Sequence, residues 1–305
     1  MKKLLISGVS GLLGANLALE ASRSYKVIGL VHSHILSGTP FEVRAQDLTN
    51  LDSIAGMLDE IKPDAVINCA AQTNLDAVEV DPRPAWLLNA EMPGVLASEC
   101  AARNIQLAHI STDAVFDGVH GSYTEESIPY PINTYGHTKL AGEKAVLTAN
   151  PAAIVARVVF YGWSPSGKRS LSEWFLSNLM AGQSIQGFKD IFFCPLLANQ
   201  LSQLLLEMMD QSLSGLYHLV SRDFTSKYQF GVALAAQFKL DSGLITPASY
   251  GEVERPAPRS PNLILKTEKL TRDLRKPLPD IHSGIEQLYH LHQEGYPGKL
   301  IKYMQ

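Results

Sequence analysis

Short apolar runs alternate with helix-like segments over the first half of the chain. Strands are predicted at the apolar runs 4–7, 26–31, 64–69, 105–110 and 152–159. Helices are predicted at 15–20, 51–61, 84–103 and 132–150, and the third should break near Pro93. A weaker apolar patch lies near Val43. Strands that alternate with helices are typical of a parallel sheet covered on both faces, so we predict an α/β fold with a doubly wound parallel sheet.

The pattern becomes irregular after residue 160. Glycine, proline and serine cluster at 162–167 and 255–261, and helix-like pieces occur at 171–181, 196–210, 226–237 and 280–294. We expect one domain at 1–160, followed at 161–305 by a smaller α/β substrate lobe that is interleaved with the last elements of the sheet.

Composition narrows the class of protein. The chain has 305 residues, of which 46% are hydrophobic, so it can bury a substantial core. A net charge of -4 without a basic run gives no reason to expect a nucleic-acid partner. Cys69, Cys100 and Cys194 suggest no disulfide framework and fit a reducing cytoplasm. The apolar run at 4–7 ends at Gly8, too early for a signal or membrane segment, so we expect a cytoplasmic protein without membrane contact.

A glycine-rich turn joins the first strand to the first helix. Gly8, Gly11 and Gly14 have the spacing G-x-x-G-x-x-G, which differs from the G-x-G-x-x-G of the two-domain dehydrogenases. Glycines here would let a pyrophosphate approach the backbone at the helix N-terminus, where free N–H groups and the helix dipole favour an anion. A turn that binds no ligand is the alternative.

A tyrosine and a lysine share one face of the helix predicted at 132–150. Tyr135 and Lys139 are four residues apart, so both can act on one bound molecule. A nearby cation favours the phenolate and brings the phenol closer to use as a proton donor or acceptor. Ser111 and Thr112 end the preceding strand, and successive strand residues point to opposite faces, so only one of them should face a ligand. Either hydroxyl could instead satisfy backbone groups at the strand end.

Four motifs in this order resemble the extended short-chain dehydrogenase/reductases, and most of all their dTDP-4-dehydrorhamnose reductase branch. They are the glycine turn, Asn68-Cys69-Ala70-Ala71, the segment 111–118 and the segment 135–143. The similarity is densest over residues 1–160 and continues faintly through 215–218 and Arg255-Pro256. It implies that 1–160 is an NAD(P)-binding Rossmann domain.

The resemblance also implies catalytic roles. Tyr135 would protonate a carbonyl oxygen as hydride arrives, and Thr112 would hydrogen-bond the same oxygen. Lys139 would lower the pKa of Tyr135 and bind the nicotinamide ribose. We choose Thr112 over Ser111 because it aligns with the family's active hydroxyl.

Cofactor contacts are implied in the same way, from the glycine turn for the pyrophosphate to Asp47 and Leu48 for the adenine. The expected cofactor-binding residues are Gly8, Gly11, Leu12, Leu13, Gly14, His32, Asp47, Leu48, Cys69, Ala70, Ala71, Asn89, Tyr135 and Lys139. A helix-preceding cap is the alternative role for Asp47. The second strand ends in Val31-His32-Ser33-His34, without an acid for an adenosine 2′-hydroxyl, so we expect NADP(H) rather than NAD(H). His32-x-His34 and His290-x-His292 lack a third ligand, and no metal is expected.

Three functions fit these motifs. The first is NADPH-dependent reduction of a 4-keto nucleotide sugar. The second is 4-epimerisation or 4,6-dehydration on the same fold; Ala114 after Asp113 removes the second carboxylate that dehydratases use, whereas epimerisation stays open. The third is a non-catalytic NADP-binding regulatory subunit similar to the β subunit of methionine adenosyltransferase. A homodimer is an open expectation for each.

The substrate lobe carries no motif that identifies a sugar or a base. Candidates by composition alone are Trp163, Lys168, Arg169, Trp174 and Arg255. Ala114 and the segment 157–162 depart from the family's pattern, and the loop 189–195 is more apolar than the family's polar version. Three roles are open for Ile191, Phe192 and Phe193 in this loop: ordinary core of the lobe, the wall of a pocket for a less polar substrate, or a contact with a second chain.

Overall fold

The computed structural model describes residues 1–252 and 257–304, so Arg255 and Pro256 lie outside the described residues. Its centre is a sheet of seven parallel strands in the order β3-β2-β1-β4-β5-β6-β11, which confirms the predicted doubly wound α/β fold. The strands are β1 (Lys3–Ser7), β2 (Lys26–Val31), β3 (Glu42–Ala45), β4 (Ala65–Asn68), β5 (Gln106–Thr112), β6 (Ile154–Val158) and β11 (Gly215–His218). The chain runs outward from β1 to β3 and then returns to β4 on the other side of β1. This reversal places a crevice beyond the carboxyl ends of β1 and β4.

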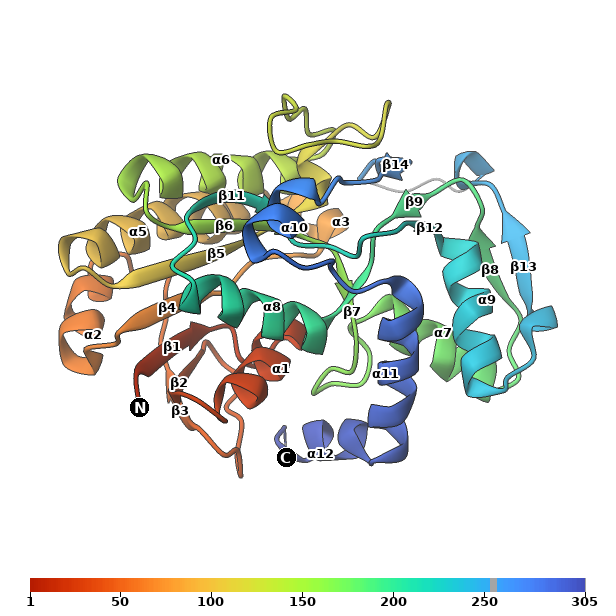
Figure 1. Cartoon of the computed structure of the whole chain (residues 1–305), viewed down its shortest axis with the longest axis horizontal. Coiled ribbons are helices and arrows are strands. Elements are labelled where there is room, and N and C mark those ends of the chain that lie inside the picture. Colours follow the sequence, from red (N-terminus) through yellow and green to blue (C-terminus); the bar gives the residue numbers. More distant parts are fainter. Residues whose placement is uncertain (253–256, 305) are drawn as a thin grey trace.

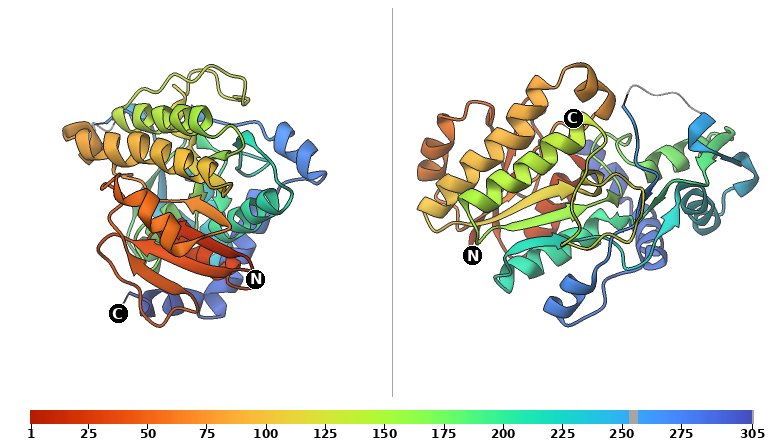
Figure 2. Two further views of the ribbon diagram at one scale, coloured as in Figure 1. Left: turned by 90° about the vertical axis from the view of Figure 1, so that its left-hand side faces the viewer. Right: turned by 90° about the horizontal axis from the view of Figure 1, so that it is seen from above.

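Helices cover both faces of the sheet (Figures 1 and 2). One face is covered by α2 (Ser53–Ile61), α5 (Met92–Ala102) and α6 (Thr134–Ala149), and the other by α1 (Leu12–Ala21) and α8 (Ala198–Asp210). Alternate residues of β1 belong to different cores: Leu5 packs with the first group of helices, and Leu4 and Ile6 with the second. Both faces of the strand are therefore apolar, as expected for a buried parallel sheet.

The helix predicted at 84–103 is divided, but one turn earlier than expected. α4 (Arg83–Trp86) is followed by a π-helical turn at Leu87–Glu91, and α5 continues through Pro93. A proline in a helix cannot donate to the carbonyl four residues back and crowds it, so the chain widens before Pro93. The displaced Asn89 carbonyl lies against Gly142 of α6, where any Cβ would overlap it. The wide turn thus brings α6 close to α5.

The second half of the chain builds a smaller unit at one end of the sheet (Figure 1). It contains α7 (Leu171–Met180), α9 (Lys227–Phe238), β8 (Ile185–Phe188) with β13 (Ile245–Ala248), and β9 (Phe192–Phe193) between β12 (Thr225–Ser226) and β14 (Asn262–Leu263). The pieces predicted at 171–181, 196–210, 226–237 and 280–294 all form helices, the last being α11 (Ile281–Gln293). Strand β11 lies beyond residue 160 and yet pairs with β6 in the large sheet. The predicted division of the chain into two domains at residue 160 therefore stays a proposal.

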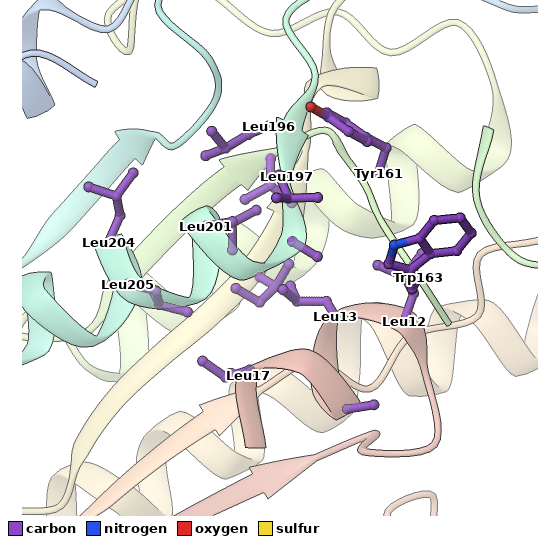
Figure 3. Close-up of a cluster of buried hydrophobic side chains, with 14 of the residues drawn as sticks. Leu12, Leu13, Leu17, Tyr161, Trp163, Leu196, Leu197, Leu201, Leu204 and Leu205 are labelled. Atoms are coloured by element: carbon purple, nitrogen blue, oxygen red, sulfur yellow. The ribbon is translucent and has the colours of Figure 1, made fainter. Parts of the chain in front are cut away.

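A leucine-rich core joins the first helix to residues beyond 160 (Figure 3). Leu13 and Leu17 of α1 face α8, from which Leu201 and Leu205 project toward them, and Leu12 lies beside Trp163. All of these side chains are buried. The helix that begins at the glycine turn is therefore anchored to the second half of the chain. No helix within residues 1–252 and 257–304 is long and apolar enough to span a membrane.

Candidate active site

A cavity of about 480 Å³ lies at the carboxyl ends of β1, β4 and β5, between the sheet and the smaller unit. Most of the residues expected to bind cofactor or substrate line it. These are Gly8, Gly11, Leu12, Leu13, Gly14, Cys69, Ala71, Thr112, Tyr135 and Lys139. The crevice that the strand order creates is thus also where the predicted chemistry gathers.

The glycine turn has the shape that a dinucleotide phosphate requires. Gly8 has φ of 71°, a left-handed conformation that favours glycine, and a Cβ there would lie 3.1 Å from the Ala70 backbone. A Cβ at Gly14 would overlap the Gly8 carbonyl oxygen and lie 2.9 Å from Val9 Cα. Gly11 precedes α1 without a side-chain cap, so the first-turn N–H groups of α1 have no partner within the helix or from a capping side chain. These residues fit an anion at the helix N-terminus.

Asn89 acts on the site through its neighbours. It is fully buried, its Oδ1 accepts from the Gln72 N–H at 2.8 Å, and its Nδ2 donates to the Thr138 Oγ1 at 3.0 Å. It therefore joins the loop after β4 to α6, and it does not line the cavity. Ala70, between Cys69 and Ala71, likewise contributes its backbone N–H, which donates to Ser7 Oγ at 3.1 Å.

His32, Asp47 and Leu48 lie outside the cavity lining. His32 Nε2 is 3.9 Å from Asp47 Oδ1, beyond the ends of β2 and β3. Asp47 accepts from the N–H and hydroxyl of Thr49 at 2.9 and 2.6 Å, and these bonds lower its pKa. The alternative role of Asp47 as a helix-preceding cap is wrong, because Asp52 precedes α2 and Asp47 bonds with Thr49 in the turn before it. Leu48 is buried in the core beside α2. Their contact with adenine stays a prediction.

The helix α6 presents Tyr135 and Lys139 to the cavity together. Asn133 caps the helix, since its side chain accepts from the Gly136 N–H at 2.8 Å. Lys139 is buried, and its Nζ donates to the Ile110 carbonyl at 2.7 Å. Burial lowers the pKa of Lys139 to about 8 against the opposing effects of Glu143 and Cys69.

The expected lowering of the Tyr135 pKa by Lys139 is wrong for this structure. Burial raises the pKa of Tyr135 to about 12, the Asp113 carboxylate adds to the rise, and a hydrogen bond with Thr112 opposes it. The ammonium of Lys139 is instead bonded to the Ile110 carbonyl. Tyr135 is therefore a protonated phenol at neutral pH, which is the form that a proton donor needs.

The two hydroxyls at the end of β5 are distinguished by their partners. Ser111 Oγ donates to Glu143 Oε1 at 2.5 Å, and Glu143 is itself paired with buried Arg157 at 2.8 Å. The Thr112 hydroxyl acts on Tyr135, since it lowers the pKa of that phenol against the effect of burial. Thr112 therefore lies beside the phenol, whereas Ser111 donates a hydrogen bond to the buried ion pair of Glu143 and Arg157.

Asp113 belongs to the motif at 111–118, but the motif predicted no catalytic or binding role for it. It is buried, lines the cavity, and its Oδ1 is 3.2 Å from Thr112 Oγ1. Burial raises the pKa of its carboxyl to about 7, while Thr112 and Lys227 act in the opposite direction. Its position directly after Thr112, beyond a parallel strand, was the signal that could have identified it.

The far wall of the cavity comes from the second half of the chain. Ile191, Phe192 and Phe193 all line it, and Phe193 also belongs to the main core, so this loop serves as core and as pocket wall. Three cations, Arg169, Lys227 and Arg259, line it as well.

Among the composition-based candidates that the structure describes, Arg169 lines the cavity. Trp163 is buried and donates to the Leu288 carbonyl at 3.1 Å, Lys168 is exposed, and Trp174 packs on Phe175. No sequence motif around Lys227 or Arg259 indicated a binding role, because these residues reach the cavity only when the chain folds.

The doubly wound sheet, the glycine turn and the group of Thr112, Tyr135 and Lys139 define an extended short-chain dehydrogenase/reductase, as the motifs predicted. The sequence matches the RmlD substrate binding domain family over residues 1–293, and the chain belongs to this family.

Several relatives span nearly the whole chain. A probable low-salt glycan biosynthesis reductase, Agl14, from Haloferax volcanii is 32% identical, covering 93% of this chain and 96% of its own. Methionine adenosyltransferase 2 subunit beta from Xenopus tropicalis is 33% identical, covering 90% and 84%. dTDP-4-dehydrorhamnose reductase from Mycolicibacterium smegmatis is 30% identical, covering 93% and 84%.

A solved structure shares the fold. The crystal structure of dTDP-4-dehydrorhamnose reductase from Bacillus anthracis in complex with NADP has a TM-score of 0.86 at 24% identity, covering 95% of this chain and 99% of that one. This structure shows that the fold is shared. The reductases among the relatives confirm the predicted class of enzyme, an oxidoreductase that acts on a CH–OH or carbonyl group.

Proposed function

We propose that this protein is an NADPH-dependent reductase of a 4-keto nucleotide sugar. The observation that carries the proposal is that Thr112, Tyr135 and Lys139 line one cavity together with the glycine turn. Relatives named as a glycan biosynthesis reductase and a dTDP-4-dehydrorhamnose reductase support it.

The chain's own residues have distinct parts in this reaction. When bound, NADPH supplies the hydride that reaches the carbonyl carbon. Tyr135 transfers its O–H proton to the carbonyl oxygen, and Thr112 donates a hydrogen bond to the same oxygen while charge develops there. Lys139, whose Nζ is held by the Ile110 carbonyl, would bind the cofactor ribose. The carbonyl gains one hydride and one proton and becomes an alcohol.

Three cations on the lobe side support a nucleotide sugar as substrate. Arg169, Lys227 and Arg259 come from the second half of the chain and line the cavity, and a nucleoside diphosphate carries the negative charge that would pair with them. The apolar side chains at 191–193 also line the cavity. A deoxygenated carbon of the sugar could pack on them without desolvating a hydroxyl.

We further propose that NADP(H) is preferred to NAD(H). His32 is exposed beyond β2, and no acid occupies the end of that strand to accept from a 2′-hydroxyl. Fluorescence titration should give at least about tenfold tighter binding of NADPH than of NADH, as expected for one added charge-assisted contact. Tighter binding of NADH would overturn the preference.

The reductase assignment is tested with dTDP-4-keto-6-deoxyhexoses and NADPH, by the loss of NADPH absorbance. Turnover is expected with at least one sugar of this class, and its absence with all of them would overturn the substrate assignment. An epimerase would change the sugar without net consumption of NADPH, so analysis of the products separates the two enzymes.

A regulatory subunit is the second candidate, favoured by the similarity to methionine adenosyltransferase 2 subunit beta. It predicts a larger enzyme that co-purifies with this chain and no turnover by the isolated protein. A cytoplasmic location and a homodimer also stay proposals; for the first, the support is that Cys69, Cys100 and Cys194 are all free thiols.

A further inference from the structure

A chain of buried hydrogen bonds lies beneath the cavity and ends at Lys139. It joins Ser7 at the end of β1, Asn68 at the end of β4, His109 in β5 and Lys139 in α6. Each of these four side chains is at most 2% exposed. Ser7 directly precedes Gly8, so this series of hydrogen bonds begins at the glycine turn and ends at the catalytic lysine.

The first two members of this chain have fixed orientations. Ser7 Oγ accepts from the N–H groups of Cys69 and Ala70, both at 3.1 Å, and its own hydroxyl donates to Asn68 Oδ1 at 2.6 Å. The same Asn68 oxygen accepts from the Ala70 N–H at 3.2 Å. A flipped amide would direct its NH₂ group at two donors, so Asn68 must point its oxygen toward Ser7.

This orientation determines the tautomer of His109. Asn68 Nδ2 lies 3.1 Å from His109 Nδ1 and can only donate, so Nδ1 must carry a lone pair. Burial and the charge of Lys139 hold the pKa of His109 well below its ordinary value, which keeps the ring neutral. A neutral imidazole has one N–H, and here it is on Nε2.

The Nε2–H group of His109 faces Lys139. Nε2 is 3.5 Å from Lys139 Nζ, which also donates to the Ile110 carbonyl at 2.7 Å. An N–H directed at Nζ disfavours an ammonium proton on that side and favours the lone pair of a neutral amine. Glu143 on α6 and Cys69 after β4 act in the opposite direction, whereas burial acts with His109.

We propose that His109, held as the Nε2–H tautomer by Asn68 and Ser7, is a positioning residue that controls the placement and protonation of Lys139. The kinetic part of this inference rests on the proposed reductase function, while its structural part does not. The same chain of bonds makes the position of Lys139 depend on the residue that precedes the glycine turn.

Nitrogen-15 NMR of the full chain tests the tautomer directly. A His109→Gln spectrum identifies the signal of this ring among the nine histidines. At neutral and alkaline pH, His109 should have a lone-pair-bearing Nδ1 and a protonated Nε2. An Nδ1–H tautomer or an imidazolium would overturn the proposal, and because this measurement needs no turnover, it decides the point even if the reductase assignment fails.

Asn68→Asp tests the consequence for Lys139. The isosteric carboxylate accepts where the amide donated, so His109 should become the Nδ1–H tautomer and turn the Nε2 lone pair toward the ammonium. The pKa of Lys139 should then rise, and the alkaline limb of the kcat/KM profile for reduction should move up by about one pH unit.

His109→Gln is the matched control, because its amide can keep an N–H donor where Nε2–H was. Its alkaline limb should stay near that of the wild type, even if its rate is lower. A merely structural role would lower the rates of both variants without moving either limb. If Asn68→Asp switches the tautomer of His109 but leaves the alkaline limb of the kcat/KM profile unmoved, the control of Lys139 by His109 is overturned. If the protein has no turnover, the pH dependence of NADPH affinity replaces the kcat/KM profile as the readout.

Discussion

At the scale of single residues, burial gives Tyr135 and the polar groups around it pKa values that differ from those in water. The phenol is held protonated, the Asp113 carboxyl titrates near neutrality, and Lys139 titrates well below an ordinary lysine. The sequence could predict Thr112, Tyr135 and Lys139 because each belongs to a short motif. It could not predict the direction of the Tyr135 shift, because that depends on what surrounds the folded ring.

Asp113→Asn should change how stability depends on pH. The pKa of Asp113 is raised to about 7 by burial, so the folded protein keeps a proton that the unfolded chain releases at its ordinary pKa. The free energy of unfolding should therefore fall as pH rises from about 4 to about 7, and the substitution should remove on the order of 2–4 kcal/mol of this fall, because an amide does not titrate. Urea denaturation of both proteins across this range is the measurement, and parallel curves would contradict the shift.

At the scale of elements, the strand order and the helix α1 together create the cofactor end of the site. The alternation of apolar runs was enough to predict the parallel sheet and most of its helices. It missed α3 (Leu75–Val80). It also placed the irregular turn of the 84–103 segment too late, because the π-helical turn depends on the close approach of α6 as well as on Pro93. Local sequence reports the proline but not the neighbouring helix.

Gly14→Ala should weaken cofactor binding by at least about tenfold, since a methyl group there would push α1 away from the Gly8 turn and displace the N–H groups that face the phosphates. Gly56→Ala is the matched control, because Gly56 lies in α2 with open space around it. That change should leave NADPH affinity unchanged and add about 0.5–1 kcal/mol of stability. Equal NADPH affinity in both variants, by fluorescence titration, would contradict the role of the turn.

At the scale of the whole molecule, the site is complete only because two parts of the chain meet. Arg259 reaches the cavity while paired with Asp76 of α3 at 3.0 Å, which ties the segment after residue 256 to the sheet side. Residues 169, 227 and 259 are distant in sequence and share no motif, so the substrate wall could not be predicted from local patterns. The residues expected on the cofactor side directly follow successive strands, so local patterns could point to them.

Arg169→Ala should raise KM for the nucleotide sugar about tenfold or more, because it removes one charge-assisted contact with the diphosphate, and it should leave NADPH affinity unchanged. Lys168→Ala is the matched control, since Lys168 is exposed next to Arg169 and does not line the cavity. Steady-state kinetics with both variants makes the comparison. The same KM in Arg169→Ala as in Lys168→Ala would exclude Arg169 from substrate binding.

The central claim is that this chain delivers hydride and a proton to a sugar carbonyl at Tyr135. The most direct measurement uses NADPH deuterated at the nicotinamide C4 and a dTDP-4-keto-6-deoxyhexose, with mass spectrometry and NMR of the product. We predict one deuterium at the sugar carbon 4 with the wild type, and a rate at least about 100-fold lower with Tyr135→Phe, which should still bind NADPH. A product without deuterium, or full activity in Tyr135→Phe, would contradict the claim.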